Sequence, residues 1–184
     1  MEHDLQVRIL KELLQQLDTG KNVDAGVQYK MSTEVYTCSE IAARERQALF
    51  LEHPQLIGLS GDLPEPNTWF TIDDFGVPVL ATRNQAGEFK AFVNACRHRG
   101  ARLTKEARGK GSRFICPFHA WTYSTSGELL GIPQQDHFGP LNDACEGLIS
   151  LPASEHKGML WIHPKPNSEL DIAAHLGHLD DEIT

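Results

Sequence analysis

Long apolar runs are missing from this sequence of 184 residues, and so is an excess of positive charge. No stretch approaches the ~18 consecutive apolar residues of a membrane-spanning helix, so we expect no membrane span. The net charge of −8 argues against general nucleic-acid binding, which requires a surplus of lysine and arginine. The acidic, amphipathic residues 1–18 lack the basic and apolar regions of a secretory signal, so a cytoplasmic protein is expected.

Cysteine and aromatic residues are also few, at four cysteines and 8% aromatics. In a chain without an export signal, four cysteines favour metal binding or catalysis over disulfide bonds. The remaining composition, 40% hydrophobic and 23% charged, is typical of a soluble globular domain. A length of 184 residues allows one domain with appendages but hardly two full domains.

Positive charge is concentrated in one segment. From Arg97 to Arg113 there are seven basic residues and one acidic residue, Glu106. The segment therefore has a net charge of +6, and the rest of the chain has a net charge of −14. A run of like charges is usually a solvated loop. Here it lies between the two halves of a metal-ligand motif, so docking of a partner or tuning of the metal site is an equal alternative.

Two helices are expected before residue 56. Leucine and isoleucine recur at helical spacing over residues 3–18, with Gly20 as the stop. Residues 37–40, Thr-Cys-Ser-Glu, have the form of a capping box, and they predict a second helix that runs to about Leu51 and cannot continue past Pro54.

From residue 56 onward the sequence predicts short antiparallel strands. Runs rich in β-branched and aromatic residues alternate with turn residues, and 84–87 and 126–127 are typical hairpin connections. The expected strands are 56–59, 69–72, 77–83, 89–94, 113–115, 121–124, 128–130, 149–151 and 159–163. The fold class is therefore mainly β with N-terminal helices (α+β), built as a small antiparallel sandwich or barrel. The expected units are a helical extension (1–55), a β-domain (56–165) and an acidic tail (166–184).

Two short motifs carry the chemistry. Cys96 and His98 follow the expected strand 89–94, Cys116 and His119 follow the strand 113–115, and 17 residues separate the two motifs. Each motif places one thiolate and one imidazole on a tight loop. Two such loops facing one another supply two sulfur and two nitrogen ligands to a metal centre.

Two kinds of centre accept this donor set: tetrahedral zinc, or an iron–sulfur cluster with mixed ligands. Zinc fingers of the Cys₂His₂ type keep the cysteines on one arm and the histidines on a helix, whereas here each arm carries one of each. A two-iron cluster explains the mixing, because both cysteines can bind one iron and both histidines the other. Zinc remains the alternative.

The stretch CRHRG…CPFHAW, residues 96–100 and 116–121, resembles the Rieske domain of aromatic-ring-hydroxylating oxygenase α subunits, which are non-haem iron enzymes. The resemblance extends from about Tyr36 to Pro164. It implies an antiparallel β-sandwich with two cluster-binding loops that hold a Rieske [2Fe-2S] cluster through Cys96, His98, Cys116 and His119.

The resemblance also implies a function. In the family the cluster relays electrons from a ferredoxin or an NAD(P)H reductase to a mononuclear non-haem Fe(II) in a larger catalytic domain, where O₂ is activated for mono- or dioxygenation. Family members assemble as homotrimers or as α3β3 complexes.

Two neutral imidazoles in place of two thiolates make reduction of a cluster easier, because the oxidised core is then neutral. The potential expected is in the range of roughly −150 to +300 mV, towards its low end. Rieske proteins of respiratory complexes carry an extra cysteine in each loop. Here Ala101 and Phe118 lie near those places, so the resemblance implies no disulfide.

Several neighbours of the four ligands have expected supporting roles. Trp121 covers the cluster or simply packs in the core, and Tyr123 donates a hydrogen bond to a cluster sulfur. Gly100 and Pro117 shape the loops. Arg97 and Arg99 either present positive charge to an acidic electron donor or pair internally with carboxylates such as Asp136. The other two cysteines, Cys38 and Cys145, are expected to be structural.

The catalytic domain of the family is not expected within this sequence, because only 65 residues follow His119. A facial triad is imitated by residues of the tail, but their spacing does not resemble that of the family; these residues are Asp171, His175, His178 and Asp180. We therefore expect an N-terminal piece of an oxygenase that transfers electrons and does not itself hydroxylate. The alternatives are a free-standing Rieske-type ferredoxin and a zinc-stabilised interaction module.

Overall fold

The structure is a computed structural model, and it describes residues 2–21, 26–137 and 147–183. Cys145 lies outside the described residues. None of the described helices is both long and apolar enough to cross a membrane.

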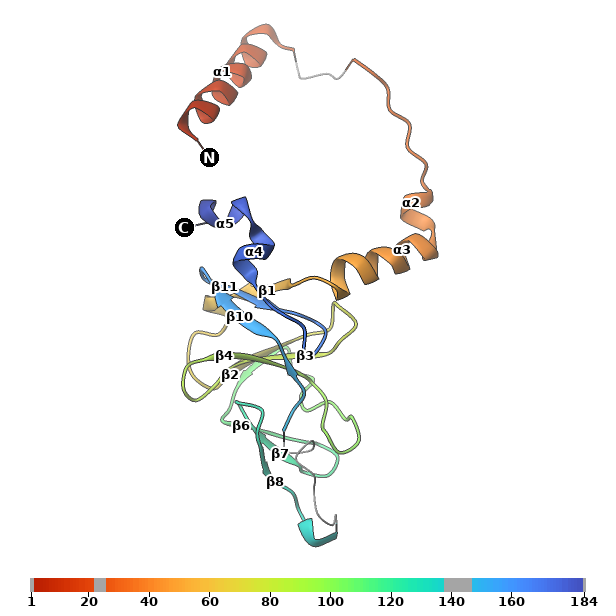
Figure 1. Cartoon of the computed structure of the whole chain (residues 1–184), viewed down its shortest axis with the longest axis vertical. Coiled ribbons are helices and arrows are strands. Elements are labelled where there is room, and N and C mark those ends of the chain that lie inside the picture. The colour runs from red at the N-terminus through yellow and green to blue at the C-terminus, as the bar shows by residue number, and fades with distance from the viewer. Residues whose placement is uncertain (1, 22–25, 138–146, 184) are drawn as a thin grey trace.

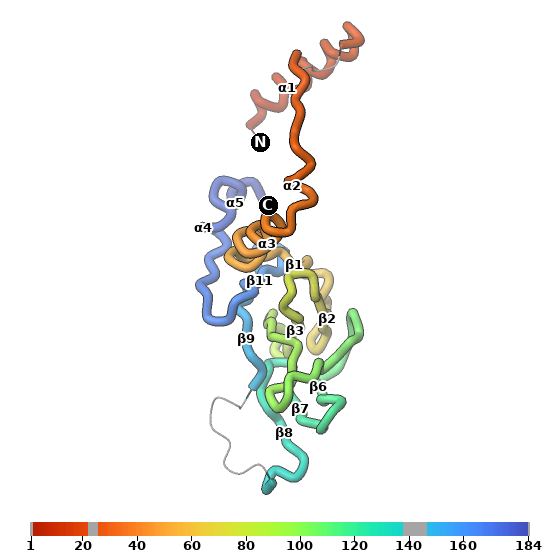
Figure 2. Tube along the Cα trace, turned by 90° about the vertical axis from the view of Figure 1, so that its right-hand side faces the viewer, coloured from red at the N-terminus to blue at the C-terminus, as the bar shows by residue number. Residues whose placement is uncertain are grey.

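The first expected helix is confirmed. Helix α1 (His3–Thr19) ends at Gly20, whose φ of 64° places it in the left-handed region, and the Gly20 N–H donates to the Leu17 carbonyl. None of the residues of α1 is buried, and the helix stands apart from the β-body in both views (Figures 1 and 2). Its leucine stripe therefore makes no contribution to the core of this domain.

The second helix forms, but the expected capping box does not. Thr37 is the last residue of a short helix α2 (Glu34–Thr37), and Cys38 occupies the cap position of α3 (Ser39–Glu45) without a side-chain cap bond. Within α2, the Thr37 hydroxyl donates to the Thr33 carbonyl. Helix α3 continues as a π-helical segment η1 (Arg46–Leu51).

Among the described residues, three antiparallel sheets make up the body of the molecule (Figure 1). The first has the order β1-β11-β10, the second β5-β2-β3-β4-β9 and the third β6-β7-β8. The strands are β1 (Gln55–Leu59), β2 (Thr68–Ile72), β3 (Val79–Arg83), β4 (Phe89–Val93), β5 (Arg108–Lys110), β6 (Arg113–Ile115), β7 (Thr122–Ser124), β8 (Leu129–Gly131), β9 (Ser150–Leu151), β10 (Ala153–His156) and β11 (Met159–Ile162). Short 3₁₀ turns form at η2 (Ser60–Asp62) and η3 (Gln135–His137). The fold class expected from the sequence is confirmed.

Strands β5 and β10 were not expected, because neither has the apolar pattern of a strand. β5 reads Arg-Gly-Lys, and it pairs with β2 through Gly109 opposite Trp69. A Cβ at residue 109 would overlap the Trp69 ring, so the glycine lets the two strands approach. Both strands are defined by their partners and not by their own side chains.

Two buried clusters form the core. One packs the first two sheets together around Phe70, Val79, Leu160 and Ile162. The other lies between the second and third sheets, and it contains both motif cysteines together with aromatic and aliphatic side chains; it comprises Leu80, Phe92, Cys96, Leu103, Phe114, Cys116, Trp121, Tyr123 and Leu148. The candidate metal ligands are thus part of a packed core.

Part of the acidic tail is folded onto the first sheet. It contains helices α4 (Ile172–Leu176) and α5 (His178–Glu182), and Ile172 is buried. The His156 ring, on β10, lies 2.6 Å from the Asp180 carboxylate on α5. Lys157 also pairs with Asp180, and the His175 ring contacts Trp161, so the tail is anchored by both polar and apolar contacts.

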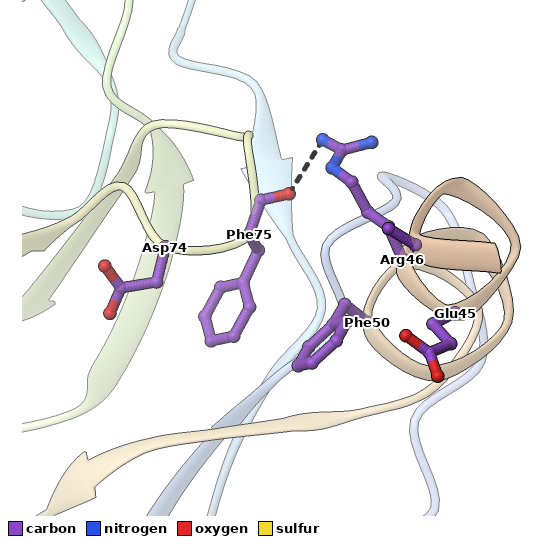
Figure 3. A pocket seen from close by; sticks show the side chains of 6 residues that line it. Glu45, Arg46, Phe50, Asp74 and Phe75 are labelled. Carbon is purple, nitrogen blue, oxygen red and sulfur yellow. Dashed lines mark hydrogen bonds between the residues drawn. The ribbon is translucent and has the colours of Figure 1, made fainter. Parts of the chain in front are cut away.

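A pocket of about 320 Å³ separates the helical extension from the connection between β2 and β3 (Figure 3). The rings of Phe50 and Phe75 line it from opposite sides, and the Arg46 guanidinium donates to the Phe75 carbonyl at 3.1 Å. The adjacent Gly76 has a φ of 72°, and a Cβ there would overlap Arg46 Nη2. This contact ties η1 to the β-body.

Candidate metal centre

The two motif loops close in the same way, although their histidines are offset by one residue. In the first loop, the Cys96 N–H donates to the Ala101 carbonyl and the Gly100 N–H donates back to the Cys96 carbonyl, both at 2.8 Å. The first loop therefore contains a closed turn of six residues that begins at the cysteine.

The second loop repeats this pattern. The Cys116 N–H donates to the Trp121 carbonyl at 2.8 Å, and the Ala120 N–H donates to the Cys116 carbonyl at 2.9 Å. The fifth residue of each loop is left-handed: Gly100 has a φ of 69° and Ala120 a φ of 56°. The two loops therefore have matched backbones, although only the second, between β6 and β7, closes a hairpin.

The four expected ligands form a cysteine side and a histidine side. Cys96 and Cys116 are both buried, at 3% exposure, in one hydrophobic cluster. The rings of His98 and His119 have centroids 4.7 Å apart and planes inclined by 61°. His98 is half-buried and His119 is exposed, so the histidines lie nearer the surface than the cysteines.

The electrostatics of the site differ between its two sides. Burial raises the pKa of the Cys96 thiol, the neighbouring Cys116 sulfur raises it further, and hydrogen bonds from Tyr123 and from the His98 backbone lower it. Burial also lowers the pKa of His98, and the nearby His119 and Arg99 lower it further. A neutral imidazole is the form that binds a metal, so this environment suits His98 to coordination.

The Tyr123 hydroxyl lies beside the sulfur of Cys96, one of the four expected ligands. Its oxygen is 3.4 Å from Cys96 Sγ and accepts the Arg97 backbone N–H at 3.1 Å. Because that N–H occupies the oxygen, the hydroxyl hydrogen is available to the sulfur. Burial raises the pKa of Tyr123, so the hydroxyl keeps its hydrogen at neutral pH.

Trp121 and Phe118 each contact one histidine. The Trp121 ring is stacked on His98 with centroids 5.1 Å apart and planes within 6°. The Phe118 ring lies 4.0 Å from His119, centroid to centroid, at 39°.

Asn94 supports the first loop, and the sequence reading did not single it out. Its buried side chain accepts the Leu103 N–H at 3.1 Å and donates to the Thr104 carbonyl at 2.9 Å. These bonds fix the segment that returns from the loop. The available signal was a polar residue at the end of a strongly apolar strand, two positions before the cysteine.

Three of the seven basic residues between 97 and 113 are neutralised internally. Arg108 pairs with Asp62 at 2.8 Å, and two further ion pairs join Arg102 to Asp73 and Lys110 to Glu65. Within the described residues, Arg99 has no carboxylate partner, so the alternative of internal pairing with a residue such as Asp136 is not seen for it. The positive charge of the segment is smaller than its sequence indicates.

The residues that imitate a facial triad have other roles. The Asp171 side chain accepts the Ala174 N–H at the start of α4, and Asp180 pairs with His156. The His175 ring contacts those of Trp161 and His53. His178 begins α5.

Across the described ranges, no three or more Cys, His, Asp or Glu side chains gather into a group suited to one metal ion. This applies to the two loops as well as to the tail. Within the two loops, the cysteines share one hydrophobic cluster and the two histidine rings contact one another.

The fold and the two loops define a β-domain that gathers two cysteines and two histidines at a candidate metal site. The family model described as "Rieske [2Fe-2S] domain" matches residues 53–152, which is more than half of the chain. The chain belongs to the Rieske [2Fe-2S] domain family, and the cofactor indicated by this membership is the Rieske cluster.

The similar proteins are oxygenase subunits. The chain is 35% identical over 135 residues to the anthranilate 1,2-dioxygenase large subunit of Acinetobacter baylyi, a match covering 73% of this chain and 29% of that protein. It is 29% identical over 154 residues to the 2-halobenzoate 1,2-dioxygenase large subunit of Burkholderia cepacia, a match covering 81% of this chain and 33% of that protein. The chain spans about a third of the length of these relatives and corresponds to their Rieske portion.

Solved structures share the fold. A quaternary ammonium Rieske monooxygenase superposes with a TM-score of 0.75 at 25% identity, covering 85% of this chain and 43% of that one. Naphthalene 1,2-dioxygenase from Rhodococcus sp. also gives a TM-score of 0.75, at 24% identity, covering 97% of this chain and 39% of that one.

Proposed function

We propose that this chain is the electron-relay domain of a ring-hydroxylating oxygenase α subunit. Cys96 and Cys116 bind one iron of the cluster, and His98 and His119 bind the other. When bound, the cluster takes up and releases one electron at a time. The observation that carries the proposal is the pair of matched loops, which joins two buried thiols and two imidazoles at one site.

In this proposal the chain has three parts: the helical extension 1–55, the cluster domain 56–165 and a tail 166–184 that leads to a catalytic domain. The full-length protein would be an oxidoreductase dependent on NAD(P)H and O₂, with a mononuclear non-haem iron in that catalytic domain and a homotrimeric or α3β3 assembly. The share of the relatives that the chain spans supports the placement of the catalytic domain outside these residues.

The test of the cluster is metal and sulfide analysis of anaerobically purified protein, together with EPR of the reduced form. The expected result is about two irons and two acid-labile sulfides per chain and a rhombic signal with a low average g value. Substitution of His98 by Ala should abolish the signal. About one zinc per chain without sulfide would establish the zinc-stabilised module instead.

The electron donor is proposed to dock at the exposed basic side chains beside the first loop. Arg99 has no carboxylate partner among the described residues and lies next to His98, so its charge is available to an acidic ferredoxin or reductase. Charge reversal by Arg99→Glu should slow reduction by an acidic [2Fe-2S] ferredoxin severalfold at low salt, and the difference should shrink as salt is added.

The matched control is Arg108→Glu, which changes the net charge equally at a residue already paired with Asp62. It should slow reduction less. Equal slowing by both variants would show that only total charge matters and would refute this docking site.

A further inference from the structure

Four aromatic rings follow one another through the candidate metal site. Trp121 is stacked on His98, the His98 ring meets the His119 ring edge to face, and Phe118 lies against the far side of His119. The two outer rings differ: Trp121 is buried, at 3% exposure, whereas Phe118 is 60% exposed. One histidine therefore rests against the core and the other against a surface side chain.

The Trp121 contact crosses between the loops. Trp121 closes the second loop, because its carbonyl accepts the Cys116 N–H, but its ring stacks on the histidine of the first loop. Phe118, in contrast, contacts the histidine of its own loop. The buried tryptophan is thus fixed by one loop and acts on the other.

The backbone alone leaves the plane of a histidine ring loosely determined, because the χ2 torsion of histidine is broad. A nitrogen lone pair lies in the ring plane, so rotation of the ring turns the lone pair away from a metal. Stacked aromatic rings attract one another, and a buried tryptophan has little freedom to move. Because the planes of the His98 and Trp121 rings lie within 6° of each other, His98 has essentially one ring orientation. In this orientation its Nδ1 atom is buried.

We infer that Trp121 is a positioning residue that sets the ring plane of His98, and hence its coordination geometry, across the gap between the loops. This inference rests on the proposed function, since it assumes that His98 binds iron. Tyr123, on the strand that follows Trp121, makes a second contact across the same gap, to Cys96 and the Arg97 N–H. Both donors of the first loop are thus held by side chains that follow the second.

The test uses the reduced, cluster-loaded chain and pulsed EPR, which measures the magnetic coupling of each bound imidazole nitrogen to the cluster. The wild type should show two defined nitrogen couplings. Trp121→Leu should broaden or shift one of them and leave the other unchanged, because only His98 loses its stacking partner. Trp121→Phe keeps an aromatic ring at this position and should restore the wild-type coupling.

Phe118→Leu is the matched control, since it makes the same kind of change beside the other histidine. It should leave the coupling that responds to Trp121→Leu unchanged. If Phe118→Leu alters that coupling, or if Trp121→Leu alters neither, the positioning role is overturned.

Two further results keep the inference distinct from the proposed function. A wild-type cluster without nitrogen couplings would refute histidine ligation itself, and with it the proposed function. If Trp121→Leu does not retain a cluster, Trp121→Met, an apolar and flexible side chain without a ring, and Trp121→Phe decide the matter. The inference is supported if the Phe variant, and not the Met variant, retains the cluster with wild-type couplings. Wild-type couplings in the Met variant, or loss of the cluster in the Phe variant, overturn it.

Discussion

The matched backbones of the two loops predict opposite effects of two reciprocal substitutions. Gly100 and Ala120 occupy the same place in their loops and are both left-handed, but only Gly100 has the residue type that adopts this conformation without strain. Ala120→Gly should therefore stabilise the protein, and Gly100→Ala should destabilise it.

The magnitude follows from two opposing contributions. Placing an L-residue in the left-handed region costs about 1–2 kcal/mol of stability. Glycine avoids this cost, but it makes the unfolded chain more flexible, which lowers stability by about 0.4–1 kcal/mol. The Ala120 methyl is exposed, and a Cβ at residue 100 would meet no atom within 4 Å, so packing adds little to either change. The net change in the free energy of unfolding is about 0.5–1 kcal/mol in each direction.

The assay is thermal unfolding of the cluster-loaded protein under anaerobic conditions, followed by circular dichroism at one scan rate. At about 2–4 °C per kcal/mol for a chain of this size, Ala120→Gly should raise the unfolding midpoint by about 1–4 °C and Gly100→Ala should lower it by a similar amount. Iron content should be unchanged. A lower midpoint for Ala120→Gly, or no change in both variants, would show that the two positions do not share one strained backbone conformation.

Three other changes test separate contacts. Tyr123→Phe removes a hydroxyl whose hydrogen bond stabilises the reduced cluster, which is the more negative form, so the midpoint potential should fall. A redox titration should give a decrease of about 20–60 mV, which corresponds to ~0.5–1.5 kcal/mol per hydrogen bond at ~59 mV per tenfold change. Gly76→Ala should cost at least about 1–2 kcal/mol in urea unfolding, because of its left-handed backbone and the overlap with Arg46, whereas the control Gly61→Ala, in open space, should cost less. Asn94→Ala leaves buried backbone groups without hydrogen bonds, so it should lower the free energy of unfolding by about 1–3 kcal/mol per group. It should also speed loss of the cluster, which is followed by the visible absorbance, and an unaltered rate would contradict its supporting role.

Features with a local cause were predictable from the sequence. The apolar spacing of α1 and its stop at Gly20 need only neighbouring residues, and so do the hairpin turns and the placement of the cysteine and histidine pairs after strands. These features follow from backbone conformation and side-chain periodicity, which the sequence states directly.

Features that depend on distant partners were not predictable. The capping box at residues 37–40 is lost because Thr37 belongs to a preceding helix, and β10 forms because β11 offers it a partner edge. The stacking of Trp121 on His98 joins two loops through the tertiary fold, and no spacing along the chain encodes it. The roles of the site residues, as distinct from their positions, are properties of this packing.

The charge of the basic segment shows how pairing register changes a conclusion drawn from composition. β5 pairs with β2 so that Lys110 lies opposite Thr68 and Arg108 opposite Phe70. This register brings both side chains near the acids that precede β2, where they form ion pairs with Glu65 and Asp62. The positive charge of the segment that remains outside these ion pairs therefore lies off β5, as at Arg99 beside the first motif loop. Salt dependence of electron transfer should consequently follow substitutions at the loop more closely than substitutions on β5.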